Sequence, residues 1–199
     1  MADYKFPTEV VELPSKGYFY FEGHPLSTGK VEVKYMTAKE EDILTSQNLI
    51  QQGTVIDKLL EALIVDKSIN ITDMLVGDKN AVMVAARILG YGKEYSFNYD
   101  EEEHSVDLSV LEPIKIDFSK FTKGINELSY KLPVSKRELV FKLLTGKDED
   151  EITAEIKARE KVNKNQSFEL TTRLKQMIVS IDGKSEKSFI NNFVDNEFL

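Results

Sequence analysis

The stretch Val11-Glu-Leu-Pro-Ser-Lys-Gly-Tyr-Phe-Tyr20, with its continuation Gly29-Lys-Val-Glu-Val-Lys-Tyr-Met-Thr-Ala-Lys-Glu-Glu-Asp-Ile-Leu44, decides the fold expected for this chain. Leu13-Pro-Ser-Lys-Gly17 predicts a turn, because proline fixes φ and glycine permits a tight reversal. Tyr18–Phe21 is expected to be a short aromatic strand. Residues 31–35 alternate apolar and charged side chains, the period of a half-buried strand. No nucleophile motif, phosphate cradle or metal-ligand spacing occurs here, which indicates a protein that works by contact.

A helical block is expected over residues 37–92. Thr37 and Glu40 match a capping box, in which the two side chains satisfy backbone N–H groups at a helix start, and they predict a helix over about 38–48. Thr54 begins a second helix with a continuous apolar face. A third helix is predicted over 78–89 and should end at a glycine.

Residues 93–132 return to the strand period. Tyr95, Phe97 and Tyr99 alternate with polar residues, and the acidic run 100–103 separates them from a second alternating segment. This arrangement predicts a hairpin with a charged tip. Further strands are expected at 114–118 and 128–132.

Residues 133–199 are expected to be helical. Ser135 and Glu138 match a second capping box, which predicts a helix to about Leu144. Three more helices are expected, covering about 148–162, 170–181 and 189–199. The whole pattern predicts an α+β protein with two helical blocks around a small antiparallel sheet, an extended N-terminal segment over 1–36, and one or two compact domains.

Bulk composition excludes several classes of function. The chain of 199 residues has a net charge of −8, which disfavours nucleic acid as a partner because that affinity depends on neutralising phosphates. It has no cysteine, so neither a disulfide framework nor a thiolate metal site is available. No apolar run approaches a membrane span and no signal peptide is recognisable, so an intracellular protein without a membrane partner is expected.

No catalytic, cofactor-binding or metal-binding residue is predicted. His24 lies in a polar loop and is expected to be solvent-exposed. The carboxylates of Glu101-Glu-Glu103 and the His104 imidazole could be drawn as a cation site, and Glu101, Glu103 and His104 as a hydrolase centre. Neighbouring strand residues point to opposite faces, however, so these side chains cannot easily converge. A solvated hairpin tip is therefore the favoured interpretation, and the enzyme remains a third hypothesis that alanine at these three positions would test.

Two apolar segments are candidate partner-binding surfaces. The first is the expected strand with Tyr18, Phe19, Tyr20 and Phe21, and the second is the last helix with Phe189, Ile190, Phe193, Val194 and Phe198. The aromatic strand could instead be core, or a platform for stacking bases. The last helix could either pack on residues 168–181 as part of the core or dock on another subunit through its apolar face.

Several segments continue the pattern of the quoted stretch, namely Asp57-Lys-Leu-Leu-Glu-Ala-Leu-Ile64, Ala86-Arg-Ile-Leu-Gly-Tyr-Gly92, and the later Thr172-Arg-Leu and Asp182-Gly183. Together these segments resemble the baseplate hub assembly proteins of T-even-like contractile-tailed bacteriophages. Members of that family often carry a cysteine pair that resembles a metal knuckle near the position of Asp100–His104. This chain has acids there, so a metal role does not carry over.

The resemblance implies a non-enzymatic assembly factor, or chaperone, for the central hub of the tail baseplate in the host cell cytoplasm. Its partners would be hub proteins or other hub assembly factors, held by apolar contacts without a nucleotide or other cofactor. The alternative is a permanent structural subunit of the hub, which would be found in the virion tail.

Overall fold

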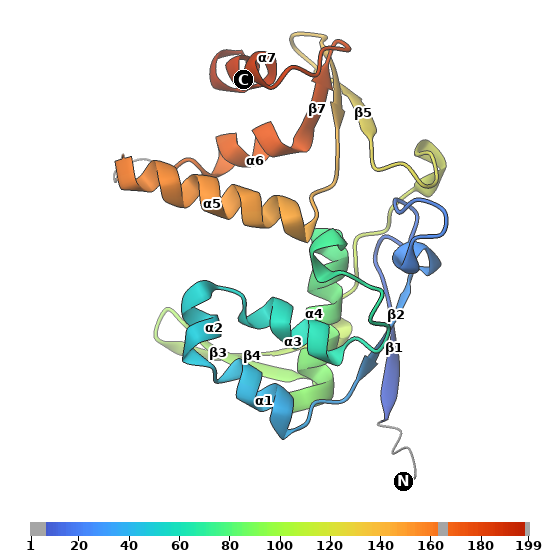
Figure 1. Cartoon of the computed structure of the whole chain (residues 1–199), viewed down its shortest axis with the longest axis vertical. Helices are drawn as coiled ribbons and strands as arrows, with labels where there is room; N and C mark the ends of the chain where they lie inside the picture. The colour runs from blue at the N-terminus through green and yellow to red at the C-terminus, as the bar shows by residue number, and fades with distance from the viewer. Residues whose placement is uncertain (1–6, 163–166, 198–199) are drawn as a thin grey trace. The chain divides into compact units, whose positions relative to one another are not determined.

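The computed structural model describes residues 7–162 and 167–197, and the chain divides into two compact units, Met1–Gly124 and Ile125–Leu199 (Figure 1). Both units combine helices with small antiparallel sheets, which confirms the predicted α+β class. The expected single sheet is wrong: among the described residues the strands form three separate sheets, β1–β2, β3–β4 and β5–β6–β7.

The first unit opens on a two-stranded sheet in which β1 (Thr8–Glu12) pairs antiparallel with β2 (Lys30–Lys34). Val31 and Val33 point into the core from β2, as their alternation predicts. The strand expected at Tyr18–Phe21 is wrong, because this segment lies in consecutive turns. Its backbone N–H groups are used locally: Tyr18 donates to the Ser15 carbonyl and Tyr20 to the Gly17 carbonyl.

Helices follow the sheet, and with the 3₁₀ turns η1 and η2 they carry most of the first core. Their bounds are η1 Pro25–Thr28, α1 Ala38–Leu44, α2 Gln47–Gln52, α3 Val55–Leu63, η2 Ile71–Asp73 and α4 Val76–Tyr91. The capping box of Thr37 and Glu40 is confirmed at the start of α1. The helix expected over 38–48 is divided at Thr45 and Ser46 into α1 and α2. Leu60 and Leu63 of α3 and Val82 of α4 are fully buried, and the two helices contact each other.

The predicted hairpin is confirmed as β3 (Glu94–Tyr99) and β4 (Glu102–Asp107). Asp100 and Glu101 close it with φ of 51° and 65°, the left-handed pair that a two-residue hairpin turn requires. The short turns η3 (Leu108–Val110) and η4 (Phe118–Lys120) come next.

The strand expected at 114–118 is wrong. No neighbouring strand of the described chain pairs with it, and the Ile114 side chain is 91% exposed. The Asp117 carboxylate instead accepts a hydrogen bond from Ser119 N and opens η4. Alternation without a partner strand is therefore insufficient to make a strand here.

The second unit is a three-stranded sheet with three helices. Its elements are β5 Leu128–Lys131, β6 Glu138–Phe141, α5 Gly146–Val162, α6 Glu169–Met177, β7 Ile178–Ile181 and α7 Lys187–Asn196, and β6 is the central strand. Helices α5 and α6 lie side by side (Figure 1), joined by the ion pair of Arg173 with Glu149.

Two helix predictions in this unit are wrong. Residues 135–144 form a tight turn, with Lys136 at φ 59°, and then β6, despite the Ser135 and Glu138 pattern. Leu139 pairs with both β5 and β7, so ladder hydrogen bonds on two sides outweigh a local capping pattern. The helix expected over 170–181 stops at Met177, and its last four residues form β7.

Candidate functional site

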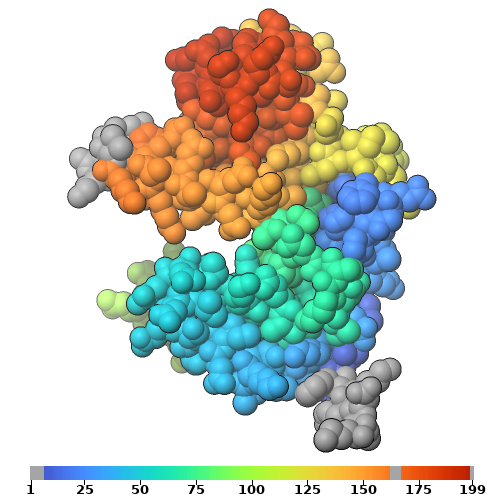
Figure 2. All heavy atoms as spheres, in the orientation of Figure 1, coloured from blue at the N-terminus to red at the C-terminus, as the bar shows by residue number. Residues whose placement is uncertain are grey.

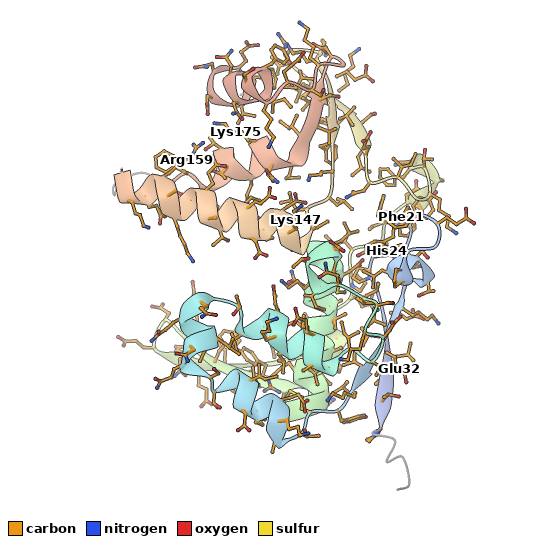
Figure 3. All side chains as sticks on the ribbon, in the orientation of Figure 1. Phe21, His24, Glu32, Lys147, Arg159 and Lys175 are labelled. Atoms are coloured by element: carbon orange, nitrogen blue, oxygen red, sulfur yellow. The ribbon has the colours of Figure 1, made fainter. Side chains whose placement is uncertain are left out.

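The aromatic turn at Tyr18–Phe21 lies mostly inside the first unit. Phe19 and Tyr20 are only 5% and 7% exposed, and Tyr18 is half-buried against Phe118 with its hydroxyl donating to the Phe121 carbonyl at 2.9 Å. Phe21 differs, since it is 63% exposed and lies edge-on to His24 (Figure 3). Three of these four proposed contact residues are therefore taken up by packing within the unit.

The buried carboxylate of Asp78 fixes this turn on α4. It accepts hydrogen bonds from Ser15 N at 2.9 Å, Ser15 Oγ at 2.6 Å and Tyr20 Oη at 2.7 Å, and it is 1% exposed. Burial, added to by the charge of Asp78, raises the pKa of the Tyr20 phenol well above its usual range. The phenol therefore stays a donor, and it also accepts from Leu75 N.

The aromatic face of α7 is core. Ile190, Phe193 and Val194 are 4%, 1% and 7% exposed and pack against strands β6 and β7. Phe189 is half-buried, with Lys184 Nζ 5.1 Å from its ring centroid. Phe198 lies outside the described residues. The alternative in which this helix packs within its own unit is thus what the structure adopts.

The titratable groups weighed for chemistry do not converge. Within residues 7–162 and 167–197, no group of three or more His, Asp or Glu side chains could hold a metal ion. His24 is half-buried rather than solvent-exposed; its Nδ1 accepts from Leu26 N, and its ring stacks on Tyr20. In the same residues, no helix has both the length and the apolarity needed to cross a membrane.

An exposed aromatic face lies on the β3–β4 hairpin. Directly paired residues share a face of a sheet, so Tyr95, Phe97 and Tyr99 lie on the side that also carries His104 and Val106. The ring centroids of Tyr95 and Phe97 are 5.9 Å apart, and those of Phe97 and His104 are 5.7 Å apart. The exposed fractions of Tyr95, Phe97 and Tyr99 are 44%, 41% and 70%. We call these three rings the hairpin aromatic face.

The hairpin aromatic face runs into an apolar cavity of about 360 Å³. Tyr95 belongs to both, and the other walls come from α1, α3, α4, η3 and the segment between β2 and α1. The remaining lining residues are Met36, Leu44, Ile56, Leu59, Met83, Val84, Ala86, Arg87, Tyr91 and Leu108. The Met36 side chain packs directly on Gly90, where a β-carbon would overlap the Met36 Cε. The Tyr91 hydroxyl donates to Glu41 Oε1 at 2.6 Å and ties α4 to α1.

Arg87 is the charged group in the cavity wall, and its guanidinium is already engaged. It donates to the Gly92 carbonyl at 3.1 Å and the Glu94 carbonyl at 3.4 Å. It also lies over the rings of Tyr91 and Tyr95, at 4.9 Å and 5.7 Å from their centroids. Arg87 therefore orients the hairpin on the end of α4.

The hairpin is strongly acidic around its aromatic rings. It holds six carboxylates, Glu94, Asp100, Glu101, Glu102, Glu103 and Asp107, and the adjoining Lys93 is bound to Asp107 at 2.8 Å. The other five form no salt bridge within the part of the chain that the structure describes. The hairpin tip projects beyond α2 (Figure 2). Glu102 shares the ring-bearing face and Asp100 and Glu101 lie at its tip, whereas Glu94, Glu103 and Asp107 lie on the opposite face. An apolar surface with carboxylates at one end is suited to holding another molecule by contact and charge.

The sequence contains the signal for this surface without revealing its exposure. Alternation at Tyr95, Phe97 and Tyr99 predicts a strand with one apolar side, but only the assembled fold shows that no second layer covers it. The acids on both strands and the tip are the one sequence feature that could have separated an exposed hairpin from a core one, because unpaired charges are rarely buried.

Comparisons of the chain with protein-family models, with curated proteins and with solved structures find no match. The residues and their geometry therefore carry the functional inference.

Proposed function

We propose that this protein is a non-enzymatic assembly factor for the central hub of a contractile-tail baseplate, and that it acts by protein–protein contact. The resemblance at Val11–Tyr20 and its continuation to Leu44 supplies the context. The observation that carries the contact mechanism is the hairpin aromatic face, which is exposed and continuous with an apolar cavity.

The position of this face fits a holding role. Its rings stand on a two-stranded hairpin, a structure that is only marginally stable by itself in water. A partner that covers Phe97 and Tyr99 would supply the missing second layer and would itself have an apolar surface shielded. Such shielding needs no covalent step and no nucleotide.

Coexpression with each hub subunit, followed by purification, tests the proposal. We expect at least one subunit to copurify, and Tyr99→Ser to reduce the recovered complex severalfold. Tyr130→Ser is the matched control, because Tyr130 is also an exposed strand tyrosine, 53% against 70%, in the second unit. Failure to recover any hub subunit, or equal loss in both variants, would contradict the proposal.

Mass spectrometry of purified tails separates an assembly factor from a permanent hub subunit. The proposal predicts that the chain is absent from finished tails or far below the amount of the hub proteins. Recovery in a fixed ratio to those proteins would instead identify a structural component.

A further inference from the structure

We propose that the partner segment held by the hairpin aromatic face and the adjoining cavity is a basic amphipathic peptide segment, with large apolar side chains in the cavity and Lys or Arg side chains over the hairpin carboxylates. This rests on the proposed function in one respect only, that the surface holds a protein.

The cavity selects an apolar group. Its volume of about 360 Å³ falls in the range of about 300–1,000 Å³ typical of ligand pockets. Its walls are Leu, Ile, Met, Val, Ala and Tyr side chains, and Arg87 already donates to two backbone carbonyls and lies over two rings. Arg87 is the one charged residue among the described residues that line the cavity, so a cationic group entering here would lose water without gaining an opposite charge.

The surface extends too far for a small apolar molecule alone. Tyr95 lines the cavity, and Phe97 and Tyr99 continue the same face along β3, away from the cavity and toward the tip. A compact ligand in the cavity would leave these two rings exposed. An extended segment of a partner protein covers the cavity and the rings together, which is how an amphipathic peptide occupies a groove.

The charge of the hairpin determines which kind of partner segment can bind. Glu102 stands on the aromatic side, opposite Tyr99, and Asp100 and Glu101 lie next to it in the turn at the tip. Cations on the partner would meet carboxylates that have no salt bridge within the described chain. An acidic segment would be repelled. A second copy of this chain carries the same acidic tip and the same net charge of −8, so it lacks the complementary cations that a basic partner supplies.

A tryptophan-labelled peptide gives a selective readout, because the chain contains no tryptophan. The reporter is a Leu/Lys peptide of roughly 18 residues, about 27 Å as a helix, with one Trp on its apolar side. Two matched peptides replace every Lys by Glu, or every Leu by Ser. With the full chain we expect a blue shift of Trp emission for the Leu/Lys peptide alone, and a loss of affinity of about tenfold when salt is raised from about 0.05 M to about 0.5 M.

Charge-reversal variants locate the contact. Glu101→Lys with Glu102→Lys should weaken binding of the Leu/Lys peptide by about tenfold or more. Asp150→Lys with Glu160→Lys makes the same change in net charge on exposed positions of α5 and serves as the control, with less than about a twofold effect expected. Equal weakening by both pairs, or a blue shift with the Leu/Glu peptide, would overturn the inference.

The coexpression experiment keeps the two proposals separate. If a hub subunit copurifies but its complex withstands high salt and the Glu101→Lys, Glu102→Lys change, the assembly role stands and the basic partner is wrong. If the peptide results are as expected and no hub subunit is recovered, the binding surface stands and the assembly role is wrong.

Discussion

The phenol oxygen of Tyr20 donates a 2.7 Å hydrogen bond to a carboxylate oxygen of Asp78, which lies 58 residues further along the chain. Both side chains are buried, and the same phenol accepts a hydrogen bond from Leu75 N. The bond pins the turn after β1 to the first turn of α4, and it makes the most characteristic segment of the sequence part of the interior.

Tyr20→Phe is expected to destabilise the protein by about 1–3 kcal/mol, because it leaves the buried Leu75 N–H without an acceptor and removes one donor from Asp78. Urea unfolding followed by circular dichroism measures the change. Tyr99→Phe, at a 70% exposed side chain, is the control and should shift the midpoint little. Equal midpoints for the two variants would contradict the role given to this hydrogen bond.

Gly17→Ala should destabilise the protein by more than about 2 kcal/mol. Gly17 has φ of 72°, and a β-carbon there would overlap the Ser27 carbonyl oxygen. Gly53→Ala has nearly the same backbone strain, at φ of 74°, with open space around the new methyl group, and it should cost only about 1 kcal/mol. The loss of unfolding free energy in Gly17→Ala minus the loss in Gly53→Ala gives the steric contribution at Gly17, and a difference near zero would rule that contribution out.

Glu40→Gln is expected to show a pH-dependent loss of stability. Burial raises the pKa of the Glu40 carboxyl, but hydrogen bonds from Lys34 and Thr37 outweigh this effect and lower its pKa from 4.5 to about 2. Because the folded pKa is depressed, the carboxylate stabilises the fold fully above about pH 4.5, and this contribution disappears as the pH falls through about 2.

The loss in Glu40→Gln should therefore be on the order of 2–3 kcal/mol near neutral pH and should shrink steadily below about pH 4.5. Urea midpoints at about pH 7, about pH 4 and about pH 2.5 give the profile. Glu12→Gln is the control, since the Glu12 side chain is 76% exposed and its ion pair with Lys30 contributes little. A loss that stays constant with pH would show that the carboxylate charge is not responsible.

Phe193→Ala and Phe97→Ala should behave in opposite ways. Phe193 is 1% exposed in the core of the second unit, so its truncation should cost about 3–5 kcal/mol. Phe97 is 41% exposed, so its truncation should cost about 1 kcal/mol or less while weakening partner binding. Thermal unfolding and copurification measure the two effects. A stable Phe193→Ala protein that fails to bind would restore α7 as the contact surface.

Local patterns predicted well where one segment decides the outcome. The Thr37 and Glu40 capping box, the apolar face of α3, and the hairpin with its acidic turn at Asp100 and Glu101 depend on neighbours in sequence, and the structure contains them. The same reasoning was wrong at 135–144 and 178–181. There, partners far along the chain chose a strand over a helix.

The candidate site shows the same division. Sequence patterns marked aromatic residues at 18–21 and 189–198 as contact surfaces, but an apolar stripe is equally suited to a core and to an interface. Burial of Tyr20 on Asp78 and of Phe193 against β7 removes them from the surface, and the hairpin aromatic face remains exposed.

The sequence by itself determined the α+β class, the acidic character and most helix and hairpin positions, because capping, helical periodicity and strand alternation act over a few residues. Only the tertiary structure decided that β6 is a strand, that the Tyr18–Phe21 turn is mostly interior, and which aromatic face stays exposed. Those outcomes depend on which distant surfaces meet, since hydrogen-bond ladders and burial are satisfied between segments that a local pattern cannot pair.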